Sequence, residues 1–184
     1  MTFKTTPGNL LETTEGIIVH GCNCIGGFGS GIAGQIRAKW PTVAQEYEHW
    51  FETNPGRDRR LGDVQVLIGT AIKARIEASS EETQRKLASY IDGVLPELPP
   101  HLILVNGFTQ FLYGGKSKAD ILYADYDAIS AVFARLAALS KATKLPVFFP
   151  QIGAGLANGD WTEISRRIAF ALDGVDSTYV EYRP

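Results

Sequence analysis

The stretch from residue 16 to residue 34, GIIVHGCNCIGGFGSGIAG, constrains the fold of this chain more than any other. Residues 17–19 are β-branched and lie in an apolar run that is too short for a helix of its own. Glycines at positions 26, 27, 29 and 31 follow, and they permit backbone conformations that other residues resist. This order predicts a strand, a loop and the start of a helix. Backbone N–H groups that converge there, at the positive end of a helix dipole, favour an anion such as phosphate.

Composition narrows the classes of protein to consider. The chain has 184 residues, 45% hydrophobic and 21% charged, so we expect one domain over residues 1–184. With 18 Lys and Arg against 20 Asp and Glu, the net charge of −2 provides no overall basic field for nucleic acid. No apolar run is long enough for a membrane span, and the first residues lack a signal-peptide pattern. Cys22 and Cys24 are too few for a disulfide framework, so we expect a reduced, cytoplasmic protein.

Strand-like segments alternate with segments of helical periodicity along the chain. The expected strands and strand-like segments cover residues 2–4, 10–12, 16–20, 63–68, 101–108, 146–152 and 178–182. The expected helices cover residues 30–40, a stretch beginning at 42, and residues 79–91, 125–141 and 161–172. This alternation predicts an α/β fold with a mostly parallel sheet, whose first and last strands are free to run in either direction. Ligands of such sheets lie at the carboxyl ends of strands, where three of these strands meet glycine-containing loops.

Residues 29–34 fit the G-x-G-x-x-G fingerprint of dinucleotide-binding proteins, but the surrounding sequence does not. That fingerprint requires a second strand soon after the helix, whereas here Trp40-Pro41 leads into another helix. No Lys-Ser or Lys-Thr pair closes the loop, which excludes a P-loop.

A second strand, loop and helix sequence, FFPQIGAGLANGDW, places further glycines at positions 153, 155 and 159. Two such loops on one sheet edge could hold a diphosphate between them. The alternative is that both are tight connections between strand and helix.

The segments VHGCNCIGGFGSGIAGQI, LILVNGFTQFLYGG and PQIGAGLANGDW, with GNLLE upstream, resemble the macro domain family, in particular the subgroup similar to the yeast ADP-ribose 1″-phosphate phosphatase. The resemblance covers nearly the whole chain. It implies a three-layer α/β/α fold with a central mixed, mostly parallel sheet and a cleft for ADP-ribose. Residues from about 71 to 100 lie outside it and are expected to form an insertion.

The resemblance also implies roles for particular residues. Asn9 stands where the family usually has an aspartate for the adenine amino group, and its amide oxygen could accept the same hydrogen bond without charge. Asn23 matches an asparagine at the distal ribose, and an aromatic face at Phe108 or Tyr113 could pack on a sugar or base. The expected ligand-binding residues are Asn9, Leu10, Asn23, Gly27, Phe28, Gly29, Ser30, Gly31, Ile32, Phe108, Tyr113, Gly153, Ala154, Gly155, Leu156 and Ala157.

The candidates for catalysis are Asn23, His20 and Asp160. For each of them a purely structural role is the alternative. Asn23 could instead bond nearby backbone, as asparagine does in turns. His20 could donate a proton to a leaving group or be a satisfied core histidine. Asp160 could orient the attacking water or attack phosphorus, although Asp160 with Glu163 three residues later also reads as a helix cap. Lys116 and Lys118 could touch a terminal phosphate or be solvated.

Three functions remain open from the sequence. The first is hydrolysis of ADP-ribose 1″-phosphate to ADP-ribose and phosphate, with charge on the phosphoryl oxygens stabilised by the glycine loops. The second is removal of ADP-ribose from modified protein or nucleic acid, and the third is a reader that binds ADP-ribose without chemistry. No metal-ligand motif or cofactor signature is evident, so we expect a reaction without metal or cofactor. We expect ADP-ribose or its 1″-phosphate as the partner, and no membrane; the charge does not indicate nucleic acid.

Overall fold

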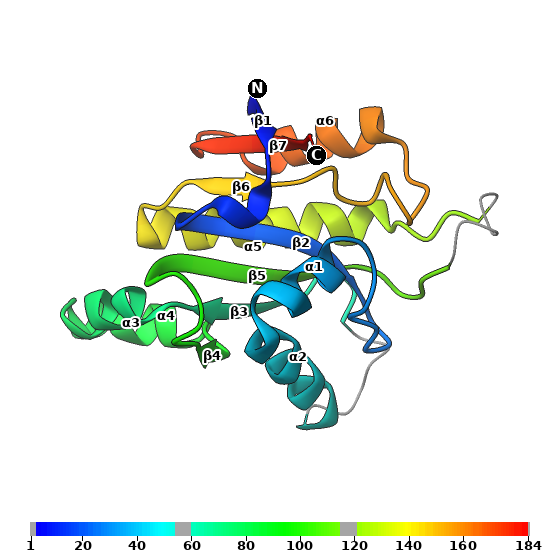
Figure 1. The fold of residues 1–184 in the computed structure, drawn as a ribbon. Helices are drawn as coiled ribbons and strands as arrows, with labels where there is room; N and C mark the ends of the chain where they lie inside the picture. The colour runs from blue at the N-terminus through cyan, green and yellow to red at the C-terminus, as the bar shows by residue number, and fades with distance from the viewer. Residues whose placement is uncertain (1–2, 54–59, 115–120, 184) are drawn as a thin grey trace.

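The computed structural model describes residues 3–53, 60–114 and 121–183 of the chain. A single mixed sheet of seven strands forms its centre in the described residues (Figure 1). In spatial order the strands are β1 (Lys4–Gly8), β7 (Ser177–Tyr182), β6 (Val147–Phe149), β2 (Glu15–Asn23), β5 (His101–Gln110), β3 (Val64–Ile68) and β4 (Gly93–Val94). Neighbouring strands run parallel except β3 and β5, which are antiparallel.

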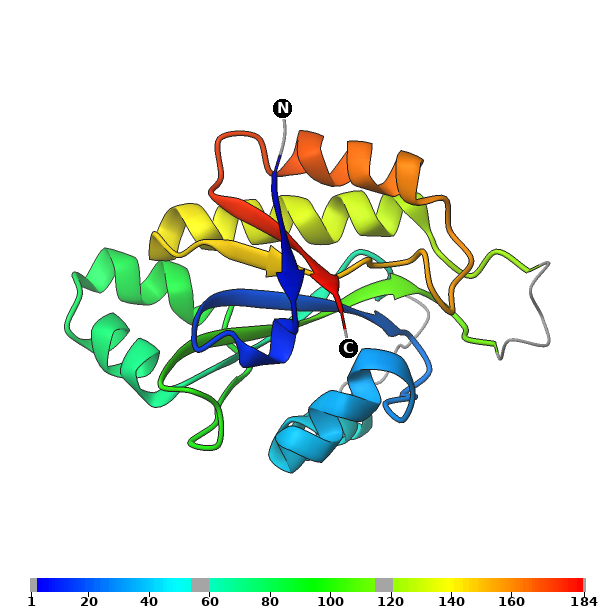
Figure 2. The ribbon, with the colours of Figure 1, turned by 45° about the horizontal axis from the view of Figure 1, so that its top comes forward.

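Helices cover both faces of this sheet, which makes the three-layer α/β/α architecture expected from the sequence (Figure 2). One face carries the helices α3 (Thr70–Glu77), α4 (Glu81–Ala88), α5 (Tyr126–Thr143) and α6 (Trp161–Ala171). The other carries α1 (Gly31–Lys39), α2 (Pro41–Thr53) and the short 3-10 helix η1 (Leu10–Glu12).

The central position of β2 in the sheet explains the apolar run Ile17-Ile18-Val19. Ile17 and Val19 enter the core under α5, while Ile18 between them enters the core under α1 and α2. All three side chains are at most 1% exposed. A strand that is buried on both faces has no polar alternation, because neither side meets water.

Several predicted elements differ from the structure. Residues 10–12 form η1 rather than a strand, because the Asn9 side chain caps this turn by accepting a hydrogen bond from the Leu11 N–H at 3.0 Å. The first strand lies at Lys4–Gly8 instead of residues 2–4, and it runs parallel to the last strand, β7.

The predicted helix over residues 79–91 is also wrong in its bounds. Only α4, at Glu81–Ala88, lies within this range, and Ser80 caps it. A separate helix that was not predicted, α3, precedes it at Thr70–Glu77. The strand β4 pairs with β3 and forms that edge of the sheet. The segment from about 71 to 100 therefore lies at one end of the molecule. No helix in the described part of the chain is both long enough and apolar enough to cross a membrane.

Candidate functional site

A cleft with a volume of about 570 Å³ opens at the carboxyl ends of β2 and β6. Its walls come from the loop between β2 and α1, the loop between β6 and α6, the start of η1 and the end of β7. The lining residues are Asn9, Leu10, Gly21, Cys22, Asn23, Gly27, Gly29, Ser30, Gly31, Ile32, Ala33, Gln35, Gln110, Tyr113, Gly114, Pro150, Gln151, Ile152, Gly153, Gly155, Leu156, Ala157, Val180 and Tyr182. The two predicted glycine loops therefore face the same cavity.

Asn23 shapes the first loop with its own side chain. Its Oδ1 accepts hydrogen bonds from the Ile25 N–H at 3.1 Å and the Gly27 N–H at 3.0 Å. Its Nδ2 donates to the Gly27 carbonyl at 2.7 Å. Tyr47 holds the backbone of Asn23 in turn, by donating its hydroxyl to the Asn23 carbonyl at 2.9 Å. Asn23 thus bonds nearby backbone, as one of its two predicted readings has it, and it also lines the cleft. Its contact with a ribose stays a prediction.

Close approach explains the glycine at position 27. A Cβ atom there would lie 2.5 Å from Cε1 of Tyr113, a residue in the segment after β5. Across the cleft mouth, a Cβ at Gly31 would lie 3.6 Å from Leu156 of the second loop. The absence of a side chain at Gly27 lets the Tyr113 ring approach the first loop, whereas at Gly31 it is the φ of +57° that favours glycine.

The second loop is held by backbone hydrogen bonds. The Gly159 N–H donates to the Gly153 carbonyl at 2.8 Å, which closes the loop on itself. The N–H groups of Tyr123 and Ala124 both donate to the Ala157 carbonyl, at 2.9 and 3.1 Å. Gly153 has a φ of +76°, a conformation that side-chain-bearing residues rarely adopt. These backbone hydrogen bonds define the shape of the second loop.

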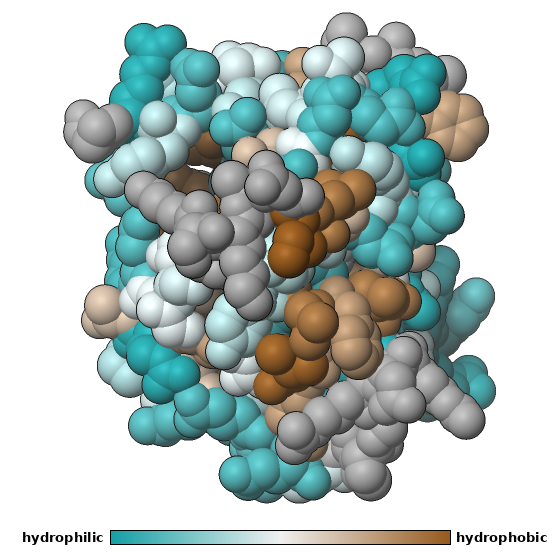
Figure 3. Space-filling view, turned by 90° about the vertical axis from the view of Figure 1, so that its right-hand side faces the viewer, coloured by the Kyte–Doolittle hydropathy of each residue, from teal (hydrophilic) through white to brown (hydrophobic). Residues whose placement is uncertain are grey.

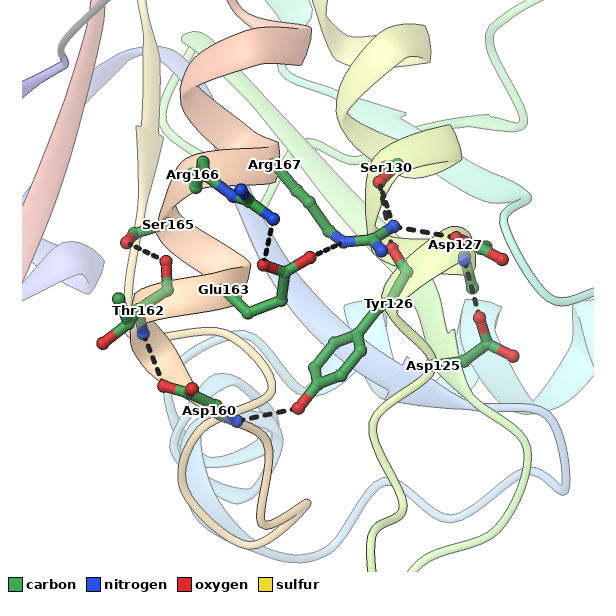
Figure 4. Close-up of polar contacts among 11 residues, drawn as sticks. Asp125, Tyr126, Asp127, Ser130, Asp160, Thr162, Glu163, Ser165, Arg166 and Arg167 are labelled. Carbon is green, nitrogen blue, oxygen red and sulfur yellow. Dashed lines mark hydrogen bonds and ion pairs between the residues drawn. The ribbon is translucent and has the colours of Figure 1, made fainter.

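Asp160 lies at the end of this loop and caps α6. Its carboxylate accepts a hydrogen bond from the Thr162 N–H at 2.8 Å, and its own N–H donates to the Tyr126 hydroxyl at 3.0 Å (Figure 4). Arg167 of α6 pairs with Glu163 of the same helix at 2.6 Å and joins α6 to α5 through Asp127 at 2.8 Å. Asp160 is not among the residues that line the cleft, and its carboxylate caps α6; its contact with a reacting phosphate stays a prediction.

His20 is a buried residue of β2, next to the lining residue Gly21. It is 1% exposed, and its Nε2 lies 2.5 Å from Oδ1 of Asn106. The Nδ2 of Asn106 donates a hydrogen bond to Gln65 at 2.7 Å, so the Oδ1 of Asn106 accepts a hydrogen bond from the Nε2–H of His20. Burial lowers the pKa of His20 to about 4 and keeps it neutral near pH 7. His20 is thus a core histidine with a hydrogen-bond partner, as one of its two predicted readings has it, and it is not among the residues that line the cleft.

Two predicted ligand contacts, Phe28 and Phe108, have buried side chains, and a third, Ala154, is half-buried. Phe108 is fully buried and stacks on Trp50 with ring centroids 5.0 Å apart. Phe28 is 2% exposed and packs on Tyr47 at 4.6 Å. Ala154 packs against the core under α5 and α6 rather than lining the cleft. These side chains support the loops from behind, because strand alternation and loop curvature turn them away from the cavity.

Charged side chains are absent from the lining. Among the described residues that form the cleft wall, none is Lys, Arg, Asp, Glu or His. Hydrophobic residues form an exposed patch on the face shown in Figure 3. The exposed large apolar residues of the segments that follow β2, β5 and β6 include Ile25, Phe111, Leu112, Ile121, Leu122 and Leu156. An anion in this cleft would depend on backbone N–H groups and on uncharged side chains.

The sequence and the structure of this chain were compared with those of known proteins. No family model matches the chain. Its structure superposes on a macrodomain protein from Streptomyces coelicolor with a TM-score of 0.66 at 23% identity, covering 100% of this chain and 99% of that one. The macrodomain of Thermus aquaticus DarG gives a TM-score of 0.67 at 19% identity, with 100% and 99% coverage.

The chain has the macrodomain fold. A further macrodomain-like neighbour, Thermosipho africanus DarTG in complex with ADP-ribose, matches with a TM-score of 0.66 at 13% identity over 42% of its length. In sequence, the chain is similar to proteins named ADP-ribose 1″-phosphate phosphatase from two yeasts. That of Candida glabrata is 27% identical, with 85% of each chain covered. That of Scheffersomyces stipitis is 26% identical, with 82% of this chain and 80% of the relative covered.

Several residues of the macrodomain cleft were missed from the sequence. Gln35, Gln110, Val180 and Tyr182 all line it, and so does Cys22. Alternation along β7 places Val180 and Tyr182 on one face, which was a readable signal. The position of β7 beside the cleft could not be predicted from the sequence, because β7 pairs with β1 and β6, which are distant in the chain.

The described residues form no cluster of potential metal ligands. Across residues 3–53, 60–114 and 121–183, no group of three His, Cys, Asp or Glu side chains could hold a metal ion. Lys116 and Lys118, considered above as phosphate contacts, lie outside the described residues.

Proposed function

We propose that this chain binds ADP-ribose in the cleft between its two glycine loops. The observation that carries the proposal is the meeting of these loops, from Gly27 to Gly31 and from Gly153 to Ala157, across one uncharged cavity at the carboxyl ends of β2 and β6. Such loops offer backbone N–H groups to a diphosphate without requiring lysine or arginine. The macrodomain fold and the neighbour solved with ADP-ribose support the same ligand.

A second candidate is catalytic: hydrolysis of ADP-ribose 1″-phosphate to ADP-ribose and phosphate. The names of the two yeast relatives favour it. In this reaction water attacks phosphorus, the bond to the ribose oxygen breaks, and that oxygen gains a proton. Neither His20 nor Asp160 lines the cleft, so we assign stabilisation of the phosphoryl charge to the loop N–H groups and no proton transfer to these two residues.

The first test is a calorimetric titration of the purified chain with ADP-ribose, beside a variant that blocks the cleft. Gly29 suits this purpose, because it lines the cleft and a Cβ there meets no atom within 4 Å. A carboxylate placed at the phosphate loop by Gly29→Glu should weaken binding by about tenfold or more through like-charge repulsion. Gln45→Glu adds the same charge on the exposed side of α2 and should leave the affinity unchanged. Equal affinity in both variants, or no binding by the unsubstituted chain, would contradict the proposal.

The second test separates the possible reactions. The same protein receives ADP-ribose 1″-phosphate, an ADP-ribosylated protein and ADP-ribosylated DNA in parallel, and released phosphate and free ADP-ribose are measured. We expect phosphate from the first substrate. Free ADP-ribose from the second or third would instead identify a de-ADP-ribosylating hydrolase, and binding without turnover of any substrate would identify a reader.

A further inference from the structure

Tyr47 of α2 lies behind the first loop, between β2 and α1, and contacts it at two points. Its hydroxyl donates to the carbonyl of Asn23 at 2.9 Å, where the loop begins. Its ring packs on Phe28 further along the loop, with ring centroids 4.6 Å apart. Tyr47 is fully buried and is not among the residues that line the cleft. It therefore holds the first loop from a position outside the cleft.

The hydrogen bond between Tyr47 and Asn23 has a defined direction. A backbone carbonyl only accepts hydrogen bonds, so the phenol is the donor. Burial raises the pKa of Tyr47 above its ordinary value, which keeps this hydroxyl protonated. Three phenylalanine rings lie around the Tyr47 ring and leave it little freedom to turn. They are Phe28, Phe51 and Phe108, at centroid distances of 4.6, 4.9 and 6.1 Å.

The helix that carries Tyr47 is anchored near both of its ends to the segment from 92 to 97. At the start of α2, the N–H of Thr42 donates to the carboxylate of Glu97 at 2.8 Å. Toward its end, the Nε1 of Trp50 donates to the carboxylate of Asp92 at 3.2 Å. This segment contains β4, which pairs with β3. The two bonds therefore fix α2, and with it the Tyr47 hydroxyl, relative to the sheet.

Asn23 transmits this constraint to the rest of the first loop. Its carbonyl accepts the Tyr47 hydroxyl, while its Oδ1 accepts the N–H groups of Ile25 and Gly27. Because these hydrogen bonds share one residue, a shift of the Asn23 backbone changes all of them together. Asn23 and Gly27 both line the cleft. The shape of this wall of the cleft thus depends on a side chain of α2.

We propose that Tyr47 is a positioning residue: its hydroxyl, acting through Asn23, holds the first loop in the shape that binds ADP-ribose. This inference rests on the proposed function, because it assigns ADP-ribose to the cleft. It extends that function to a residue that does not line the cleft. A loop that adopts the binding shape for only part of the time lowers the apparent affinity by that fraction.

The experiment measures calorimetric Kd values for ADP-ribose with the unsubstituted chain, Tyr47→Phe and Val43→Ala. Tyr47→Phe keeps the ring on Phe28 and removes only the hydroxyl, so Kd should rise about fivefold, as expected for one net hydrogen bond. Val43 is a fully buried residue of the same helix, and Val43→Ala leaves the Tyr47 hydroxyl in place. It should lower the urea midpoint of unfolding at least as much as Tyr47→Phe and leave Kd unchanged. The two variants separate positioning of the loop from a loss of stability.

Amide hydrogen exchange, followed by NMR without ligand, tests whether the effect passes through Asn23. In the unsubstituted chain the N–H groups of Ile25 and Gly27 should exchange slowly, because the Asn23 side chain holds both. In Tyr47→Phe they should exchange about fivefold faster, because the loop opens more often. In Val43→Ala they should exchange at the rate of the unsubstituted chain.

Four results would overturn the role of Tyr47 while ADP-ribose binding stands. They are an unchanged Kd in Tyr47→Phe, an equal rise of Kd in both variants, unchanged exchange of Ile25 and Gly27 in Tyr47→Phe, and fast exchange of these two N–H groups in the unsubstituted chain. The last of these results does not depend on the folding of any variant. If the unsubstituted chain does not bind ADP-ribose, the proposed function is overturned, and this inference falls with it.

Discussion

Acid should destabilise this protein through His20. The imidazole is buried, bonded to Asn106, and has a pKa lowered to about 4 by its removal from water. In the unfolded chain the same group has a pKa of 6.5. Between these two values the unfolded state binds a proton that the folded state does not. The stability associated with neutral His20 is therefore present above the unfolded pKa and is lost as the pH falls toward the folded pKa.

The size of the effect follows from the two pKa values of His20. One proton of difference changes the free energy of unfolding by about 1.4 kcal/mol for each pH unit. Integrated from about pH 7 to about pH 4.5, the loss is about 2 to 3 kcal/mol from this one side chain. That is a substantial part of the stability of an ordinary domain.

Urea unfolding at a series of pH values measures this loss. The reference variant is His20→Gln, which can still donate a hydrogen bond toward Asn106 but has no titrating group. Carboxylates elsewhere contribute equally to both proteins and cancel in the difference. The unsubstituted chain should lose about 2 to 3 kcal/mol more than the variant over this range. Parallel stability curves would show that His20 is protonated equally in both states, and would reopen its role as a proton donor.

Two further substitutions test how the cleft is built. In Gly27→Ala the new methyl would lie 2.5 Å from the Tyr113 ring, so ADP-ribose affinity should fall about tenfold, and Tyr113→Ala in the same chain should recover part of it, as calorimetry would reveal. Recovery would fail if the methyl acted elsewhere. Asp160→Ala should lower the free energy of unfolding by about 1 kcal/mol through loss of the α6 cap, whereas Asp160→Asn should preserve both stability and any phosphate release. Loss of turnover in a folded Asp160→Asn variant would restore this residue to the mechanism.

The sequence by itself determined the local units of this protein. β-branched residues 17–19 and the glycines that follow them specify β2 and its loop, because both signals act within a few residues. The periodicity of residues 125–141 likewise predicted α5, observed at Tyr126–Thr143. The second glycine loop and α6 were found in the same way. These units in order, with the family resemblance, were sufficient for the α/β/α fold.

Only the tertiary structure decided which side chains face the cleft. Val180 and Tyr182 line it because β7 pairs with β1 and β6 from distant parts of the chain. His20 and Phe108 are sequence neighbours of lining residues, yet the packing of α1 and α2 on that face of the sheet buries them. Asn9 shows the same division at one residue: its identity predicted a hydrogen bond to a base, but the bond from Leu11 decides which end of its amide remains for a ligand. Periodicity is a local property, whereas the surroundings of a side chain depend on contacts between segments that the chain brings together only on folding.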